Sequence, residues 1–415
     1  CGPFQCFIQI LLPLLKPALF SAGLFQFLWT WNDFFNTNIY INTVSKFPLS
    51  LALRVSIDVT SNIQWNQVMS MALVSILPLI LLYHVESLEQ DDTYGDYIIG
   101  RIPEAVRRQL NPKAQSNMLF VSNSELRFVM EEDAVTIVLR RLPVSGQIKS
   151  RGILEVFSGD YQGSCEISPE VIDVNETEIT IRRQDWSHIC RFPRNPGGFA
   201  PQVTRVLLPY DWGCCIREIR GAIRPPKPEE MPEKRLLFYG SSITHGGNAS
   251  VPSRTYAFQT AWELGYDFIN LGSAGSAFMD CAMAEYIAGL TDWDAAVFEL
   301  GVNVIEEWTD GQLYERAYQW IDTVKHAHPE KTVIVTDVYY NHYDFEGDER
   351  SDAFRKKIEE CVSVLEKKYD RLYYKKGTEI MGTFRGLSSD GLHPSDAGHT
   401  MMAQNLTNFM RIHGL

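Results

Sequence analysis

The sequence lacks an excess of positive charge and lacks cysteine pairs at a metal-binding spacing. Its 38 Lys and Arg are outnumbered by 51 Asp and Glu, so the 415 residues carry a formal net charge of −13. This balance argues against nucleic acid as a partner. The 8 cysteines are scattered, so we expect free thiols in a reducing compartment and no zinc site. A starting methionine and the pattern of a secretory leader are also lacking, so no ordinary signal peptide is expected.

Charge is almost missing from the first 32 residues, where Lys16 is the only charged side chain. A mostly apolar run covers residues 17–31, and a second uncharged stretch covers 61–85, with its most apolar part at 68–83. A spanning helix needs about 20 mostly apolar residues. Both stretches are therefore predicted to enter a membrane, and the alternative is a pair of buried core helices.

Residues 1–83 resemble the C-terminal part of the inner-membrane permease of bacterial sugar ABC importers. The matching residues are Gly2-Pro3-Phe4-Gln5, Ile10-Leu11-Leu12-Pro13-Leu14-Leu15-Lys16-Pro17-Ala18, Thr30-Trp31-Asn32-Asp33-Phe34 and Leu77-Pro78-Leu79. The resemblance implies that the sequence begins inside the loop that docks on the ATPase and lacks the helices of the translocation path. We therefore expect residues 1–87 to be a truncated permease-like segment that does not transport alone.

Two explanations fit the join between this segment and the rest of the chain, a true gene fusion or a frameshift in the reading frame. If residues 1–85 belong to the chain, we expect them to anchor it in the inner membrane. The remainder is expected to lie in the cytoplasm.

Short strands dominate the middle of the chain. Runs of β-branched and apolar residues, separated by turn residues, predict strands at 118–121, 125–130, 134–140, 153–157, 178–182, 203–208 and 216–223. Such a series favours an all-β sandwich or jelly-roll domain, placed at 88–228. Trp186, Tyr210 and Trp212 either form a carbohydrate platform or fill the core of this domain. The prolines of residues 224–234 then make a stiff connector.

Strands alternate with helices in the last part of the chain. An apolar strand at 235–239 stops at Gly240, and further strands are predicted at 267–271, 295–300 and 332–337, with helices at 256–263, 311–326 and 352–369. This alternation predicts an α/β domain over 229–415, with a parallel sheet between two helix layers. Catalytic groups of such sheets collect at the carboxyl ends of the strands.

Small or polar residues follow three of these strands, namely Ser242, Gly275 and Asn303. Asp390 and His393 lie three residues apart late in the chain. The carboxylate can therefore fix the tautomer of the imidazole, and the imidazole can take the proton of Ser242. The backbone N–H groups of Ser242 and Gly275 and the amide of Asn303 can direct three donors at an oxyanion. This pattern predicts nucleophilic catalysis that requires no metal or organic cofactor.

Residues 235–415 resemble the SGNH/GDSL hydrolase family. The four matching blocks are Gly240-Ser241-Ser242-Ile243, Asn270-Leu271-Gly272-Ser273-Ala274-Gly275, Gly301-Val302-Asn303-Val304 and Asp390-Gly391-Leu392-His393-Pro394. The resemblance implies a flavodoxin-like α/β/α fold with Ser242 as nucleophile, His393 as base and Asp390 as its orienting group. It also implies that Gly275 and Asn303 complete the oxyanion hole. The strand-rich segment, with Arg101-Ile102-Pro103-Glu104, resembles the sandwich that precedes this domain in a bacterial subgroup of esterases.

Two positions depart from the family pattern, because Ser241 and Val304 stand where the family has aspartates. Neither position transfers a proton or binds the oxyanion, so activity is still expected, but the substrate cannot be carried over from the family. Gly272 is an alternative to Gly275 as the glycine that faces the site. His245, just after the nucleophile, is a candidate substrate contact or a turn residue.

Purely structural roles are the alternatives for the two later histidines. His393 could be a structural residue at a helix end, and His399 is expected on a helix surface or in the core.

We therefore expect a serine esterase that acts on a small O-acyl ester, with a small molecule or a carbohydrate as substrate. The nearest alternative is an acyltransferase, in which an alcohol in place of water resolves the acyl-enzyme. Alternatives from other classes are a permease component of a sugar importer and a carbohydrate-binding protein with an inactive hydrolase domain. The intact catalytic residues argue against the last of these, and the missing helices argue against the permease.

Overall fold

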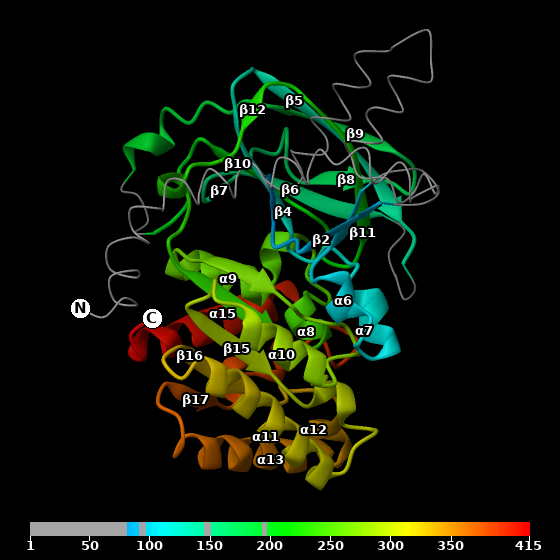
Figure 1. The fold of residues 1–415 in the computed structure, drawn as a ribbon, viewed down its shortest axis with the longest axis vertical. Helices are drawn as coiled ribbons and strands as arrows, with labels where there is room; N and C mark the ends of the chain where they lie inside the picture. Colours follow the sequence, from blue (N-terminus) through cyan, green and yellow to red (C-terminus); the bar gives the residue numbers. More distant parts are fainter. Residues whose placement is uncertain (1–80, 91–96, 145–150, 193–196) are drawn as a thin grey trace, which may run out of the picture. The chain divides into compact units, whose positions relative to one another are not determined.

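The structure is a computed structural model that describes residues 81–90, 97–144, 151–192 and 197–415. The chain divides into two units, Cys1–Leu79 and Ile80–Leu415, and all described residues belong to the second. This unit combines antiparallel sheets with one parallel sheet and its helices (Figure 1).

Two antiparallel sheets form the strand-rich part of the described chain. The first has the order β1 (Leu82–Tyr83), β4 (Glu125–Met130), β10 (Val203–Leu207), β6 (Gly152–Ser158) and β7 (Tyr161–Gln162), with β12 (Ile223–Arg224) beside β4 and β8 (Glu170–Ile172) beside β6. The second has the order β2 (Ser87–Gln90), β3 (Tyr97–Gly100), β11 (Gly213–Arg220), β5 (Ala134–Leu142) and β9 (Thr177–Arg182). Two short helices, α6 (Glu104–Arg107) and α7 (Pro112–Asn117), follow β3.

The parallel sheet has the order β14 (Asp267–Asn270), β13 (Arg235–Tyr239), β15 (Ala295–Glu299), β16 (Thr332–Thr336) and β17 (Leu372–Lys375). Its longer helices are α9 (Tyr256–Leu264), α10 (Cys281–Gly289), α11 (Asp310–Ala327), α13 (Arg350–Leu365) and α15 (Asp396–Ile412). Short helices α8 (Ser242–His245), α12 (Tyr343–Glu346) and α14 (Gly377–Ile380) lie between these elements.

Strand β13 shows why helices cover both faces of this sheet. Leu237 packs in one hydrophobic cluster with Trp320 of α11, whereas Phe238 packs in another with Tyr256 of α9. Successive side chains of a strand point to opposite faces, so a strand that is apolar throughout needs cover on both sides. The predicted parallel sheet with helices is confirmed.

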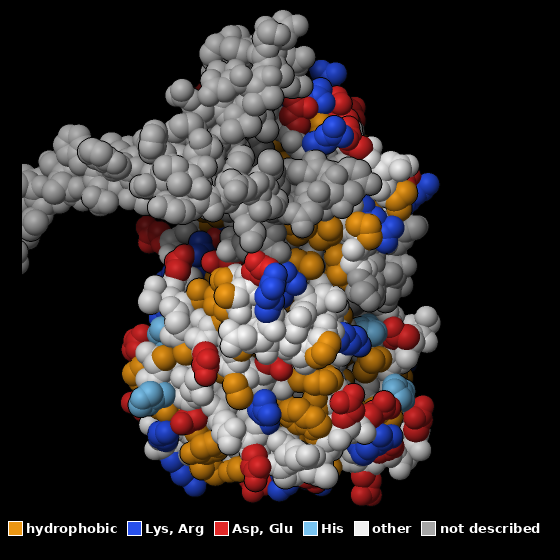
Figure 2. Space-filling model, turned by 45° about the vertical axis from the view of Figure 1, so that its right-hand side comes forward, with side chains coloured by type: hydrophobic (Ala, Val, Ile, Leu, Met, Phe, Trp, Pro, Cys, Tyr) orange, Lys and Arg blue, Asp and Glu red, His pale blue; other side chains and the backbone are white. Residues whose placement is uncertain are grey.

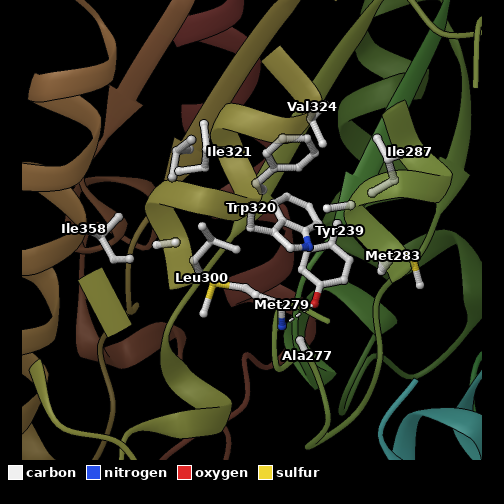
Figure 3. Packing of buried hydrophobic residues seen from close by; sticks show 14 of the residues in the cluster. Tyr239, Ala277, Met279, Met283, Ile287, Leu300, Trp320, Ile321, Val324 and Ile358 are labelled. Atoms are coloured by element: carbon white, nitrogen blue, oxygen red, sulfur yellow. Dashed lines mark hydrogen bonds between the residues drawn. The ribbon is translucent and has the colours of Figure 1, made fainter. Parts of the chain in front are cut away.

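One of these clusters also supports the loop that follows β14. The Tyr239 ring stacks on Trp320 with ring centroids 4.5 Å apart. Its hydroxyl accepts a 2.9 Å hydrogen bond from the backbone N–H of Met279, as the dashed line in Figure 3 shows. The aromatic core under the sheet therefore holds one end of this loop in place.

The strand-rich part and the parallel sheet share buried ion pairs. Arg127 of β4 donates two hydrogen bonds, at 2.9 and 2.6 Å, to the carboxylate of Asp267 at the start of β14. Both side chains are buried, and Arg127 also bonds Glu125 at 2.8 Å. Although burial alone would raise the pKa of Asp267, Arg127 lowers this pKa well below its usual range. A pair of this kind resists separation, because losing either partner leaves a buried charge.

The structure corrects two predictions. The predicted membrane stretch over 61–85 is wrong at its end, because Leu82 and Tyr83 form β1 and pair with Leu126 and Glu125. The predicted strand at 118–121 is also wrong. Met118 is the C-cap of α7, and Phe120 forms an isolated bridge to Gly213. The Asn111-Pro112 pair at the start of α7 was a sequence signal for this helix.

Membrane-spanning helices are not found among the described residues, because no described helix combines the required length and apolar character. The predicted span at 17–31 and most of the one at 61–85 lie outside those residues. Of the proposed carbohydrate platform, Tyr210 and Trp212 are buried and therefore fill the protein interior. On the face shown in Figure 2, acidic and basic side chains are interspersed over the described surface.

Candidate active site

A tight turn after β13 presents Ser242. A Cβ added to Gly240 would lie 2.3 Å from Thr244 Oγ1 and 2.4 Å from Glu299 Oε2, so only glycine fits between the strand and the helix. The side chain of Ser241 then caps α8 by accepting from the Ile243 N–H at 3.1 Å. Ser242 is the first residue of this helix, where backbone N–H groups have no partner within the helix.

Glu299, at the end of β15, lies beneath this turn. Its Oε2 accepts from the Ser241 N–H at 2.6 Å and from the Thr244 hydroxyl at 2.9 Å. Burial raises the pKa of Glu299 to about 7, although these hydrogen bonds oppose the shift. The carboxyl group therefore ties the nucleophile turn to the neighbouring strand.

The structure brings together the three residues predicted to transfer the proton. His393 Nε2 lies 2.8 Å from Ser242 Oγ, and His393 Nδ1 lies 2.8 Å from Asp390 Oδ2. An ionised Asp390 accepts from the Nδ1–H, which leaves Nε2 free to accept the serine proton. The loop after Ser242 approaches the ring so closely that a Cβ on Gly247 would lie 2.7 Å from His393 Cδ2.

Asp390 is held as a carboxylate by several donors. Its Oδ1 accepts from the backbone N–H groups of Leu392 and His393, each at 3.0 Å, and the Ser388 hydroxyl donates at 3.0 Å. Burial alone would raise the pKa of Asp390, but these bonds hold it well below its usual value. The Asn248 amide donates to Oδ2 at 2.7 Å, which fixes the second oxygen beside the imidazole.

The two candidate oxyanion glycines differ in what their N–H groups do. The Gly272 N–H donates to Asn270 Oδ1 at 2.8 Å, so it already has a partner. Gly275 lies at φ +60°, and its N–H donates to no residue that the structure describes. The geometry therefore favours Gly275 as the donor to an oxyanion.

Asn303 lies in a short 3₁₀ turn, Val302–Val304, that follows β15. Its Oδ1 accepts from the Ala277 N–H at 3.0 Å. This bond assigns the amide orientation and leaves the amino group for another acceptor. The Gly301 residue before it has φ +110°, a backbone conformation suited to glycine.

His245, a candidate substrate contact or turn residue, is buried in the structure. The ring is 2% exposed, and Nδ1 lies 3.0 Å from the Gly272 carbonyl oxygen. Burial and the nearby Arg101 lower the pKa of His245 to about 3, so the ring is neutral. His399 is buried as well, and its Nε2 lies 3.0 Å from the Gly247 carbonyl oxygen.

Sequence reasoning missed Glu299 and Asn248. The signal for Glu299 was a single charged residue in the otherwise apolar strand 295–300. The signal for Asn248 was weaker, a polar residue after two glycines. Within the described ranges, no group of three or more His, Cys, Asp or Glu side chains is placed to hold a metal ion.

Comparisons with known proteins found two kinds of similarity, one to transporter permeases and one to proteins with a hydrolase fold. One relative is described as a probable starch degradation products transport system permease protein, AmyC, of Thermoanaerobacterium thermosulfurigenes. It is 30% identical over 83 residues, which are 20% of this chain and 30% of the relative. Protein LplC of Bacillus subtilis is 43% identical over 54 residues, 13% of this chain and 18% of LplC. The chain thus spans less than a third of the length of these relatives, and the matches to sugar ABC transporter permeases are short and partial.

Solved structures share the fold over most of the chain. A salicylyl-acyltransferase, SsfX3, from a tetracycline biosynthetic pathway has TM-score 0.66 and 17% identity, covering 80% of this chain and 94% of the other. A GDSL-like lipase of Bacteroides ovatus has TM-score 0.60 and 20% identity, covering 80% and 95%. An acetyl xylan esterase, Est2A, of Butyrivibrio proteoclasticus has TM-score 0.51 and 13% identity, covering 82% and 98%.

The family comparison agrees with the site geometry. The model of the GDSL-like lipase/acylhydrolase family matches residues 233–411, a range that contains the Ser242 turn, the loop after β14, Asn303 and the Asp390–His393 pair. Residues 233–411 are therefore a GDSL-like lipase/acylhydrolase domain.

Proposed function

We propose that this chain is a serine esterase that removes a small acyl group, such as acetyl, from a carbohydrate. The observation that carries the proposal is the relay of two 2.8 Å contacts from Ser242 through His393 to Asp390. The Asn303 amide and the Gly275 N–H supply donors for the charge that this relay creates.

The reaction follows from these contacts. As Ser242 Oγ attacks the ester carbonyl, its proton passes to His393 Nε2, and the carbonyl oxygen becomes an oxyanion. The oxyanion accepts from Ser242 N–H, Gly275 N–H and the Asn303 amide. The imidazolium then gives its proton to the leaving alcohol, and an acyl-enzyme remains. Water repeats the sequence and releases the acid.

A carbohydrate substrate is supported by two sets of similar proteins. The fold neighbours include the acetyl xylan esterase Est2A and a family two carbohydrate esterase of Cellvibrio japonicus. The permease relatives are named for starch degradation products and for alpha-glucosides. An acetylated oligosaccharide is therefore the first substrate to test.

An acyltransferase is the second candidate, favoured by the fold likeness to the acyltransferase SsfX3. The two functions share every step up to the acyl-enzyme and differ in the group that attacks it. Adding an alcohol or sugar acceptor to an ester assay separates them, because a transferase forms the new ester faster than free acid.

The proposed function is tested with short aryl esters and acetylated oligosaccharides. We expect the wild-type chain to hydrolyse them and Ser242→Ala to abolish this activity. Ser241→Ala is the matched control, because it removes the cap of α8, worth about 1 kcal/mol, and leaves the nucleophile. Loss of activity in Ser241→Ala together with activity in Ser242→Ala would overturn the assignment.

A further inference from the structure

We propose that Asn117, which lies outside the family match, is a positioning residue that holds the 274–275 peptide so that the Gly275 N–H faces Ser242. The inference rests on the proposed function, because it concerns the oxyanion hole of that esterase. It assigns a catalytic purpose to α7 and to the residues before it.

From the last residue of β14 into the loop after it, every second carbonyl oxygen is hydrogen-bonded to one neighbouring segment, residues 101–117. The carbonyls of Asn270, Gly272, Ala274 and Ser276 all accept hydrogen bonds from side chains of this segment. Arg101 donates to the first two, Asn117 to the third and Asn111 to the fourth, at 2.7, 2.9, 2.5 and 3.0 Å. The segment is therefore hydrogen-bonded to the backbone on one side of the loop, from residue 270 to residue 276.

The bond to Ala274 has a specific consequence. A trans peptide unit is planar, so its C=O and the following N–H point in opposite directions. Asn117 Nδ2 holds the Ala274 oxygen at 2.5 Å. The N–H of Gly275, on the same plane, is thereby directed away from α7. A flip of this one peptide would turn the donor out of the oxyanion hole.

Asn117 is itself fixed. Its side chain is buried, and Nδ2 also donates to Ser276 Oγ at 2.8 Å. Its backbone carbonyl accepts from the Arg101 guanidinium at 2.9 Å. Arg101 is 1% exposed and bonds only backbone carbonyls among the residues that the structure describes. A buried cation without a carboxylate partner is costly, and here its two Nη groups connect the Asn270 and Gly272 carbonyls to the last residue of α7.

Because residue 275 is a glycine, its backbone needs an external contact to fix the orientation of the 274–275 peptide. Gly275 has φ +60°, and glycine populates positive and negative φ about equally. The residue that supplies the donor therefore has little intrinsic preference for the active orientation. A side chain that bonds the Ala274 carbonyl oxygen can fix the orientation of the peptide and therefore of the Gly275 N–H.

The experiment compares two substitutions of Asn117 with matched substitutions on the same helix. Asn117→Ala removes the donor, and Asn117→Asp places a carboxylate against the Ala274 oxygen, which favours the flipped peptide with Gly275 N–H turned toward it. Gln115→Ala and Gln115→Glu are the controls, because among the described residues the Gln115 side-chain amide donates only to the Arg108 and Leu110 carbonyls of its own segment. Melting temperatures first establish that each variant is folded.

We expect kcat to fall about 10-fold in Asn117→Ala and about 100-fold in Asn117→Asp, since loss of one oxyanion donor costs about 10²–10³. KM should stay nearly constant, and phosphonate labelling of Ser242 should slow in parallel. The Gln115 variants should match the wild type. Equal kcat in Asn117→Asp and Gln115→Glu, or a loss confined to KM, would overturn the proposal.

A crystal structure of Asn117→Asp separates this proposal from the proposed function. A flipped 274–275 peptide supports the positioning role even if the wild type cleaves no ester. Failure of the wild type to cleave any ester would refute only the esterase function. An unchanged peptide in a variant with low kcat overturns the positioning role and leaves the esterase standing.

Discussion

Replacing Asn303 tests the oxyanion hole most directly. Its oxygen is occupied by the Ala277 N–H at 3.0 Å, so its amino group is the part left for substrate. Removing one such donor from a serine protease lowers turnover about 10²–10³-fold, about 2.7–4 kcal/mol. The donor acts mainly when charge has built up on the carbonyl oxygen. We therefore expect Asn303→Ala to lower kcat about 100-fold and to leave KM nearly unchanged.

An isosteric change sharpens this prediction. Asn303→Asp can still accept from the Ala277 N–H, but it puts a negative charge where the amino group was. Two unit charges 4 Å apart repel by about 4 kcal/mol at an effective dielectric constant near 20. The loss of turnover should therefore be at least as large as in Asn303→Ala.

The assay measures kcat and KM on an aryl acetate and the rate at which a phosphonate labels Ser242. Asn405→Ala is the matched control, because Asn405 is also half-buried and donates to a backbone carbonyl, that of Ile380, at 2.8 Å. Its kinetics should equal those of the wild type. If Asn303→Ala raises KM and leaves kcat intact, Asn303 binds substrate, and backbone groups alone form the hole.

Three further predictions concern the carboxyl groups and the first residues of the chain. Asp390→Asn should lower kcat about 10³–10⁴-fold, because an amide can stabilise the wrong tautomer of His393; a loss below tenfold in steady-state kinetics would refute the orienting role. Burial raises the pKa of Glu299 from 4.5 to about 7, so the folded chain holds a proton that the unfolded chain releases, and stability falls by about 3 kcal/mol as pH rises from 4.5 to 7. The free energy of unfolding of Glu299→Gln, relative to the wild type, should thus increase between pH 5 and pH 8 in urea titrations, and a constant difference would contradict the shift. The full chain should enter the detergent-rich phase of a phase-separation assay while a chain starting at Ile80 does not, and equal partitioning would count against the membrane interpretation of residues 17–31 and 61–85.

Local patterns were enough to predict the parallel sheet. The strand at 295–299 is apolar until Glu299, and Gly301 follows shortly after it. Such signals depend only on neighbours in sequence. The predicted strand at 118–121 failed because its apolar residues follow the end of α7 at Asn117, and a buried apolar run of four residues next to a helix resembles a strand. The strand at 82–83 was hidden because its pairing with Leu126 connects residues far apart in sequence.

The site divides in the same way. Ser242, Asp390 and His393 were found because the chemistry demands these residue types at the ends of predicted elements. Glu299 and Asn117 were not found, because their roles depend on which backbone group each one meets in the folded chain. A buried hydrogen bond to a peptide leaves no pattern in sequence spacing, so only the three-dimensional arrangement identifies such a residue.

Strand β14 is held at both ends by arginines from the strand-rich part, at Asp267 by Arg127 and at Asn270 by Arg101. The triad itself lies wholly within residues 233–411. A gene rearrangement that copied only this range would carry the nucleophile, base and acid but leave behind both arginines and α7. We therefore expect a recombination event that preserves the geometry of this site to transfer the strand-rich part together with residues 233–411.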